Sequence, residues 1–244
     1  MTVGRVHLSP DEPFLGYDCP ECGNRGILVW STSGGEMRAI VCACMEKRKM
    51  NKAAGSAGIG SRIDNQTRDT FVAEKAWQTS MKRESAKYLR EYAKDKRRKW
   101  FYLGGSPGTG KTHLCTAIVG ELMKSGFQAK YMIWRDEVGK LKRLANDPEY
   151  DILIREFKTV PVLYIDDFLK TASGTLPTDA DIQVAFEVVN ARYNNPDAIT
   201  IFSSERRPED ITALDQGLGG RIIERSKPFT LSVYPGHDVR TSRN

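Results

Sequence analysis

The chain has 244 residues, 40% of them apolar, which is enough for one sizeable core and a small appendage. It contains no apolar run of about 18 residues, so no membrane-spanning helix is predicted, and a polar start with Pro10 and Pro13 predicts no signal peptide. We therefore expect a cytoplasmic protein whose five cysteines are thiols or metal ligands and not a disulfide framework. A net charge of +6 fits a polyanionic partner without requiring one.

Two closely spaced pairs of cysteines lie near the N-terminal end of the sequence. The apolar stretches 27–30 and 38–41 between the pairs predict two strands, joined by a turn around Gly34 and Gly35. Such a hairpin brings both pairs to one corner, and four thiolates suit tetrahedral Zn²⁺ in a closed, structural site. Iron–sulfur ligation and unligated buried thiols are the alternatives. The four expected zinc ligands are Cys19, Cys22, Cys42 and Cys44.

The segment after the cysteines changes in composition. Alanine, glycine and serine dominate residues 53–61, which is typical of a flexible linker, so we expect a linker over 53–75. A helix is predicted over 76–96 because apolar residues recur there at helical spacing. Its inward side chains are expected to be Ala86, Leu89, Tyr92 and Ala93.

Positive charge is concentrated in residues 82–99, which hold nine Lys or Arg and three acids, a local excess of +6. Such a run is either a solvated helix face or a surface that binds a polyanion. The sequence leaves both interpretations open. Arg97, Arg98 and Lys99 are the candidates for contacts with nucleic-acid phosphates.

The centre of the sequence is a glycine-rich loop between a predicted strand and a predicted helix. The apolar stretch 100–103 leads into residues 105–112, which read Gly-Ser-Pro-Gly-Thr-Gly-Lys-Thr. The helix that follows has one apolar face, formed by Leu114, Ile118, Val119 and Leu122, and the fifth cysteine, Cys115, is expected to be buried there. Strand, loop and helix in this order are the context of a phosphate-binding loop. The alternative is a glycine-rich turn that merely starts a helix.

This loop has the parts that a nucleoside triphosphate requires. Glycines allow the backbone to curl so that its N–H groups converge on an anion, and the N-terminus of the next helix adds partial positive charge. Lys111 is expected to reach the β- and γ-phosphates, and the Thr112 hydroxyl to bind Mg²⁺. The loop residues expected to contact the nucleotide are Gly105, Ser106, Pro107, Gly108, Thr109 and Gly110.

Strands and helices alternate in the rest of the chain. Strands are predicted over 129–134, 161–165, 198–202 and 229–233, and helices over 137–145, over 150–158 and after Thr178. The helix after Thr178 is expected to turn Ile182, Ala185, Phe186 and Val189 inward. This order predicts an α/β fold with a parallel sheet and helices on both faces. Ligands bind such sheets beyond the carboxyl ends of the strands.

Acidic and hydroxyl side chains follow two of these strands. Asp166 is placed to hold Mg²⁺ facing Thr112, and Asp167 to polarise an attacking water as a general base. The alternative is a strand that simply ends in two acids. Residues 203–205, Ser-Ser-Glu, end the next strand and are candidates for orienting the water.

Phosphoryl transfer also benefits from a cation that stabilises the developing charge, often an arginine from another subunit. Residues 217–225 offer Arg221 and Arg225, and the glycines before Arg221 are expected to let it project at a subunit edge. An ordinary surface arginine is the alternative.

These motifs carry a resemblance to a known family. Residues 105–112 resemble the phosphate loop of the AAA+ ATPases, and the stretches 186–193, 201–204 and 219–225 resemble blocks of the DnaC/DnaI-type (IstB-like) helicase loaders. The cysteine ribbon resembles the amino-terminal module of DnaI-like and phage-encoded members. The resemblance covers nearly the whole chain. It implies an AAA+ P-loop NTPase domain together with an N-terminal zinc ribbon.

The resemblance also implies a function and a division into domains. The implied domains are a zinc-binding helicase-interaction module at 1–52, a linker at 53–75 and an AAA+ ATPase domain at 76–244. The protein would use ATP, Mg²⁺ and Zn²⁺ to deliver a DnaB-type replicative helicase onto single-stranded DNA, and would self-associate through the ATPase domain. By the same analogy, Arg221 would act between subunits and Ser204 would lie near the sensor position.

The sequence departs from the family pattern at two points. Glu205 stands where many relatives carry Asn, and the 23 residues after Arg221 leave no room for a helical lid domain. Without a lid we expect slow, Mg-dependent ATP hydrolysis that acts as a switch.

Three other functions fit parts of the sequence. An IstB-like helper of DNA transposition shares the ATPase motifs, but such helpers usually lack the cysteine ribbon. A small-molecule P-loop kinase would need an Arg-rich lid, and no such stretch is evident. A zinc-dependent DNA-binding protein with a degenerate ATPase is disfavoured because Lys111, Thr112, Asp166 and Asp167 are intact.

Overall fold

The computed structural model describes residues 19–23, 25–32, 34–60, 62–92, 100–171 and 175–234. The chain divides into two compact units, residues 1–53 and residues 54–244, and each is described by itself. Residues 93–99, which include the candidate phosphate contacts Arg97, Arg98 and Lys99, lie outside the described part of the chain.

The first unit contains the expected hairpin. Strands β1 (Ile27–Ser31) and β2 (Met37–Val41) pair antiparallel, with Ile27 opposite Val41. Helix α1 (Cys44–Ala57) begins at the last of the four cysteines and runs into the second unit. The hairpin predicted between the cysteine pairs is therefore present.

The second unit is built on a five-stranded sheet in which all neighbouring strands are parallel, in the order β4-β5-β6-β3-β7. The predicted α/β fold is confirmed. The central strands are buried on both faces, which is why they read as continuous apolar runs in the sequence. The strands are β3 (Phe101–Gly105), β4 (Ala129–Ile133), β5 (Val162–Asp166), β6 (Ile199–Ser204) and β7 (Thr230–Val233).

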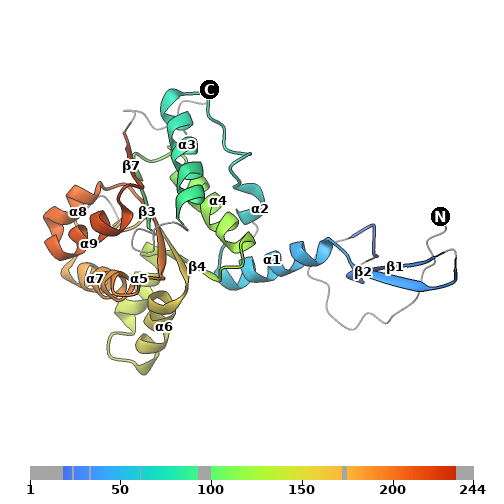
Figure 1. Ribbon diagram of the computed structural model, residues 1–244. Coiled ribbons are helices and arrows are strands. Elements are labelled where there is room, and N and C mark those ends of the chain that lie inside the picture. Colours follow the sequence, from blue (N-terminus) through green and yellow to red (C-terminus); the bar gives the residue numbers. More distant parts are fainter. Residues whose placement is uncertain are drawn as a thin grey trace. The chain divides into compact units, whose positions relative to one another are not determined.

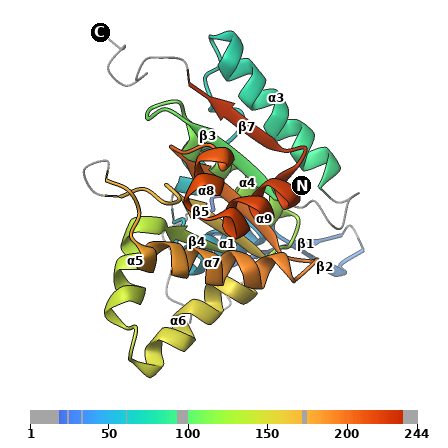
Figure 2. The ribbon, with the colours of Figure 1, turned by 90° about the vertical axis from the view of Figure 1, so that its left-hand side faces the viewer.

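Helices cover both faces of this sheet. Helices α3 (Ala76–Glu91) and α4 lie on one side of the sheet (Figure 1). Helices α7, α8 and α9 lie on the other side, in front of the strands in Figure 2. No helix in the described part of the chain is both long and apolar enough to cross a membrane. The helices after the phosphate loop are α4 (Lys111–Lys124), α5 (Trp134–Arg143), α6 (Pro148–Thr159), α7 (Asp179–Tyr193), α8 (Pro208–Leu214) and α9 (Gln216–Ser226).

Two of these helices bury the faces that the sequence predicted, one fully and one in part. On α4 the four predicted apolar residues and Cys115 are all fully buried. Helix α7 is capped by Thr178, whose hydroxyl accepts a hydrogen bond from the Asp181 amide. On α7, Ala185 and Val189 are buried as expected, whereas Ile182 and Phe186 are only partly covered.

Helix α3 (Ala76–Glu91) forms where it was predicted, but it packs through a different face. Met81, Ser85 and Tyr88 are the buried residues, and the predicted Ala86, Leu89 and Tyr92 are half-buried. Tyr88 decides the orientation because its large ring packs between Phe101 and Phe229, at centroid distances of 5.2 and 5.1 Å. Ala93 lies outside the described residues.

The stretch expected to be a flexible linker is largely folded. Helix α1 continues to Ala57, and a short helix α2 (Arg62–Asn65) follows. Ile63 lies against Gly120 of α4, so closely that a Cβ atom on Gly120 would be 3.1 Å from Ile63 Cγ1. Small residues serve close packing here and not flexibility, so the linker prediction is wrong for this part. The buried residues of this connector, defined as residues 54–75, are Ala54, Ala57, Ile59, Ile63 and Phe71.

Two neighbouring glycines of α9 provide a matched test of helix packing. A Cβ atom on Gly219 would lie 2.5 Å from the backbone nitrogen of Thr212 in α8, whereas one on Gly220 would meet nothing within 4 Å. We expect Gly219→Ala to destabilise the second unit by about 1–3 kcal/mol through overpacking. Gly220→Ala should stabilise it by about 0.5–1 kcal/mol, because alanine loses less backbone entropy in a helix. Urea denaturation of both variants measures this, and equal effects would contradict the α8–α9 contact.

Candidate nucleotide site and metal centre

The phosphate loop lies at the carboxyl end of β3, where the chain turns tightly. Gly105 is necessary because a Cβ atom there would lie 2.2 Å from the carbonyl oxygen of Val233. The Ser106 amide donates to the same oxygen at 3.0 Å, which fixes the start of the loop against β7. Gly110 has a φ of 84°, a left-handed conformation that glycine adopts without strain, and caps α4.

The ammonium group of Lys111 lies inside the curve of this loop. It donates to the carbonyl oxygens of Gly105 and Ser106, both at 2.8 Å, and Thr109 Oγ1 donates to Ser106 O at 2.9 Å. Burial lowers the pKa of Lys111 below its ordinary value, while the charges of Glu205 and Asp167 oppose that change. The loop residues predicted to contact the nucleotide thus form one cradle around a cation, and their individual contacts with phosphate stay predictions.

Asp166, at the end of β5, is a buried carboxylate surrounded by hydroxyl groups. Its Oδ1 accepts from Thr112 Oγ1 at 3.0 Å, from the Tyr164 hydroxyl at 2.8 Å and from Ser203 Oγ. Its Oδ2 accepts from the Tyr131 hydroxyl at 2.6 Å. These bonds come from α4, β4, β5 and β6, so four elements of the fold meet at one side chain.

The chemistry of this cluster fits the predicted magnesium site. Thr112 and Asp166 offer a hydroxyl and a carboxylate oxygen side by side, and Mg²⁺ prefers such hard oxygen ligands. Burial, and then the charge of Asp166, raises the pKa of the Tyr131 hydroxyl. Burial also raises the pKa of Tyr164. Both phenols therefore stay protonated and donate to the carboxylate.

The predicted base, Asp167, adopts a left-handed backbone with a φ of 54°, and its side chain is 40% exposed. Lys170 Nζ lies 3.2 Å from Asp167 Oδ2 and 2.7 Å from Glu205 Oε1, so one lysine bridges the two acids. Sequence reasoning missed Lys170. A lysine three residues beyond the predicted base carries no signal in the sequence until the left-handed turn at Asp167 is known.

Of the two serines that end β6, Ser203 is the one that contacts Asp166. Ser203 Oγ bonds Asp166 and accepts the Asp167 amide at 3.2 Å. Ser204 is buried and donates to the carbonyl oxygen of Phe168 at 2.8 Å, which is a structural contact. The sensor role implied for Ser204 stays a prediction.

Arg221 lies on helix α9 and not on a projecting glycine-rich loop, because Gly219 is used for close packing with α8. Its Nη1 donates to Gly217 O at 2.9 Å, and its guanidinium stacks over Phe186 at 4.9 Å. Arg225 is buried and donates to Tyr193 O at 3.0 Å, so it serves the core. Of the two arginines, Arg221 remains the candidate for contact with another subunit.

The two tyrosines that bond Asp166 were also absent from the predictions. Tyr164 lies two residues before Asp166, so strand periodicity places both on one face, and this signal was available in the sequence. Tyr131 is directly opposite Tyr164 in the sheet register, which only the strand order reveals. Arg62, which donates to the Tyr131 hydroxyl at 2.6 Å, was assigned to the linker.

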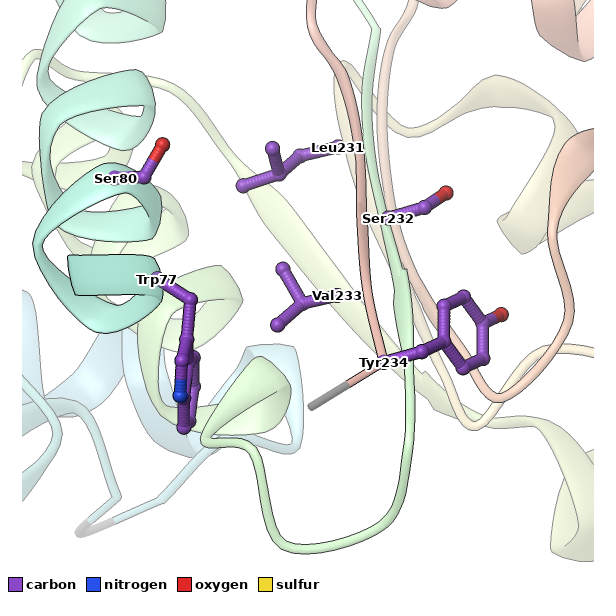
Figure 3. A pocket seen from close by; sticks show the side chains of 6 residues that line it. All are labelled: Trp77, Ser80, Leu231, Ser232, Val233 and Tyr234. Atoms are coloured by element: carbon purple, nitrogen blue, oxygen red, sulfur yellow. The ribbon is translucent and has the colours of Figure 1, made fainter. Parts of the chain in front are cut away.

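A cavity of about 300 Å³ lies beside the start of the loop, between α3 and β7. Figure 3 shows Leu231 and Val233 pointing toward α3, and Trp77 lying below Ser80. Val233 is the residue whose carbonyl oxygen holds the Ser106 amide, so the cavity adjoins the phosphate loop. Its lining combines the indole ring of Trp77 and the apolar side chains of Leu231 and Val233 with the hydroxyl-bearing residues Ser80, Ser232 and Tyr234.

In the first unit the four predicted cysteines are buried, and their sulfur atoms all lie within 4.8 Å of one another. Burial opposes ionisation of Cys22, but hydrogen bonds from the Gly26 amide and neighbouring thiols outweigh it and lower its pKa to about 6. Four sulfur ligands at one corner fit Zn²⁺ and leave no position for water, which is the donor set of a structural site.

The sheet, the loop after β3 and the buried acid after β5 define a P-loop nucleotide-binding protein. The family model described as IstB-like ATP binding protein matches residues 65–210. The chain therefore belongs to the IstB-like ATP-binding family.

One relative and two solved structures extend this assignment. The phage-like element PBSX protein XkdC of Bacillus subtilis (strain 168) is 30% identical over 246 residues, which cover 94% of this chain and 89% of that protein. The fold matches the crystal structure of the DnaC helicase loader with a TM-score of 0.56, at 22% identity, over 72% of this chain and 99% of that chain. It matches the crystal structure of DnaI with a TM-score of 0.55, at 24% identity, over 69% and 89%. The predicted resemblance to the DnaC/DnaI type is confirmed at the level of the fold.

Metal analysis tests the cysteine site. Purified protein should contain about one zinc per chain, and Cys22→Ser should lose it because three thiolates hold zinc far less tightly. Cys115→Ser is the matched control, since this thiol is buried in the second unit and should leave the zinc content unchanged. Elemental analysis by mass spectrometry measures both. Iron in place of zinc, or full zinc content in Cys22→Ser, would contradict the assignment.

Proposed function

We propose that this protein is an ATP-dependent loader that delivers a DnaB-type ring helicase onto single-stranded DNA. The observation that carries the proposal is the union, in one chain, of a four-cysteine ribbon with a P-loop ATPase that has the fold of DnaC and DnaI. XkdC aligns with 94% of the chain, so that relative shares most of both units. In this proposal the ribbon binds the helicase, and the ATPase unit binds ATP, single-stranded DNA and other copies of itself.

The chemistry proposed for the ATPase unit follows from its side chains. Lys111 and the loop amides bind the phosphates, and Thr112 and Asp166 hold Mg²⁺. Bound magnesium neutralises part of the phosphate charge and orients the phosphates. Asp167 accepts the proton of the attacking water once its ion pair with Lys170 opens. Because that pair must open first, we expect slow hydrolysis, suited to a switch.

The cavity beside the loop supports binding of a nucleoside and not of polyphosphate alone. In a nucleotide the ribose separates the base from the phosphates, so the base lies outside the loop, and we place it next to the start of the loop. The cavity lined by Trp77 and Val233 adjoins that point and offers an aromatic ring and an apolar wall. We propose it as the place of the adenine ring.

The surface of the ribbon supports a protein partner. Every residue of β2 is exposed, and the exposed apolar side chains include Ile40 and Val41, the latter 71% accessible. Apolar side chains that gather on a small two-stranded sheet are typical of a surface that a partner covers. We therefore propose β2 as part of the helicase contact.

Helicase capture by the full-length protein tests the division of labour. Cys22→Ser should lose binding because the ribbon unfolds without metal, and Val41→Asp should lose at least tenfold in affinity while keeping its zinc. Lys111→Ala should bind the helicase normally and lose ATP binding. Ile152→Asp is the matched control, because Ile152 is 66% exposed on α6 of the other unit.

Binding of Cys22→Ser at wild-type strength would remove the ribbon from the contact. If the protein does not bind DnaB-type helicases but stimulates strand transfer by a transposase, it is instead the IstB-like helper of DNA transposition.

Mixing of two inactive variants tests whether Arg221 acts between subunits. The Nε atom of Arg221 is buried without a hydrogen-bond partner among the described residues, so its present position is not its best-satisfied one. Arg221→Ala and Asp167→Ala should each lose most ATPase activity, and their mixture should recover part of it because one interface then has both residues intact. Steady-state phosphate release measures this. No recovery at any ratio removes Arg221 from the reaction.

A further inference from the structure

The connector reaches the magnesium end of the nucleotide site through two side chains. Arg62 Nη1 donates to the Tyr131 hydroxyl at 2.6 Å, and that hydroxyl donates to Asp166 Oδ2 at 2.6 Å. Asp166 Oδ1 in turn accepts from Thr112 at 3.0 Å. Helix α2, β4, β5 and the phosphate-loop helix are thus joined by an unbroken series of hydrogen bonds.

The two oxygens of Asp166 are not held alike. The Thr112, Tyr164 and Ser203 hydroxyls all bond Oδ1, and among the described residues Tyr131 is the one that bonds Oδ2. A carboxylate has about two acceptor sites on each oxygen, so Oδ1 is saturated and the remaining capacity lies on Oδ2. The Tyr131 hydroxyl therefore sets the tilt of the carboxylate and the direction of its last free site.

The connector in turn holds Tyr131. The Arg62 guanidinium lies over the Tyr131 ring at 5.6 Å while it donates to the hydroxyl. A phenol that accepts a hydrogen bond from a cation donates more strongly to its own acceptor. Gly58, also in the connector, comes close to the Tyr131 backbone, since a Cβ atom there would lie 3.8 Å from its carbonyl oxygen.

We propose that Tyr131 and Arg62 are positioning residues that set the Mg²⁺ requirement of ATP binding and couple the nucleotide site to the connector. The inference rests on the proposed binding of Mg²⁺ and ATP. Coupling is reciprocal, so a ligand that reorients Asp166 must also change the connector, and a change at Arg62 must alter metal binding. Partners of metal ligands typically change metal affinity by tenfold or more when they are removed.

The first experiment removes one hydroxyl. Binding of a fluorescent ATP analogue is titrated with Mg²⁺ for wild type, Tyr131→Phe and Tyr150→Phe. Tyr150→Phe is the matched control, because its hydroxyl also donates to a carboxylate, Glu187, at 2.6 Å but on α6. We expect Tyr131→Phe to need about tenfold more Mg²⁺ for half-maximal binding, with unchanged analogue affinity in EDTA. Tyr150→Phe should match wild type in both.

The second experiment follows the connector itself. Amide hydrogen exchange of residues 62–74 is measured for each protein without ligand, and again with Mg²⁺ and a saturating concentration of the ATP analogue. Wild type should change its protection in this segment, and Arg62→Met should not, although it still binds nucleotide. Arg62→Lys should recover part of the change, because lysine keeps the charge and a donor. Arg62 is exposed, so its variants test the coupling even where Tyr131→Phe is unstable.

The outcomes separate the two proposals. A wild-type protein that binds no nucleotide overturns both. A wild type that binds ATP with Mg²⁺, together with a Tyr131→Phe profile equal to that of Tyr150→Phe, overturns the positioning role alone. Equal exchange changes in wild type and Arg62→Met overturn the coupling.

Discussion

The second unit, which holds the candidate nucleotide site, depends on the placement of one buried carboxylate. Removing a charge from water costs several kcal/mol unless hydrogen bonds replace the lost solvation. Asp166 receives hydroxyl groups from Thr112, Tyr131, Tyr164 and Ser203, which lie on four different elements. The order of the strands brings these groups together, because β4, β5 and β6 are neighbours and end at one edge. The hydrogen bonds that stabilise the Asp166 carboxylate thus also hold together the edge of the sheet where the candidate site lies.

Local sequence patterns were sufficient for the elements and for the residues that belong to short motifs. The phosphate loop, Asp166 and the cysteine pairs each have their partners within a few residues or at the end of a predicted strand, so spacing alone located them. The hairpin between the cysteines and the alternating strands followed from periodicity in the same way. The family resemblance added the IstB-like family, which the family model and the relative XkdC confirm.

Contacts between distant parts of the chain could not be predicted in this way. Tyr131 lies opposite Tyr164 only because β4 and β5 are neighbours. Helix α3 packs through Tyr88 because Phe101 of β3 and Phe229, just before β7, contact its ring. The prediction of a flexible linker over the connector was wrong for a related reason. Glycine and alanine are typical of flexible segments, but they are equally typical of backbones that pack closely, and composition does not distinguish the two.

The close packing of Ile63 against Gly120 places the boundary of the second unit before the connector and not after it. The connector, residues 54–75, is part of the second unit. If the amino-terminal module is exchanged, in evolution or by recombination, the second unit therefore stays intact only when the join falls before Ala54. A join at Ala76 would remove the connector, which would expose the apolar surface of α4 that Ile63 covers and would leave the Tyr131 hydroxyl without its hydrogen bond from Arg62. The boundary is therefore set by packing, some twenty residues earlier than composition suggests.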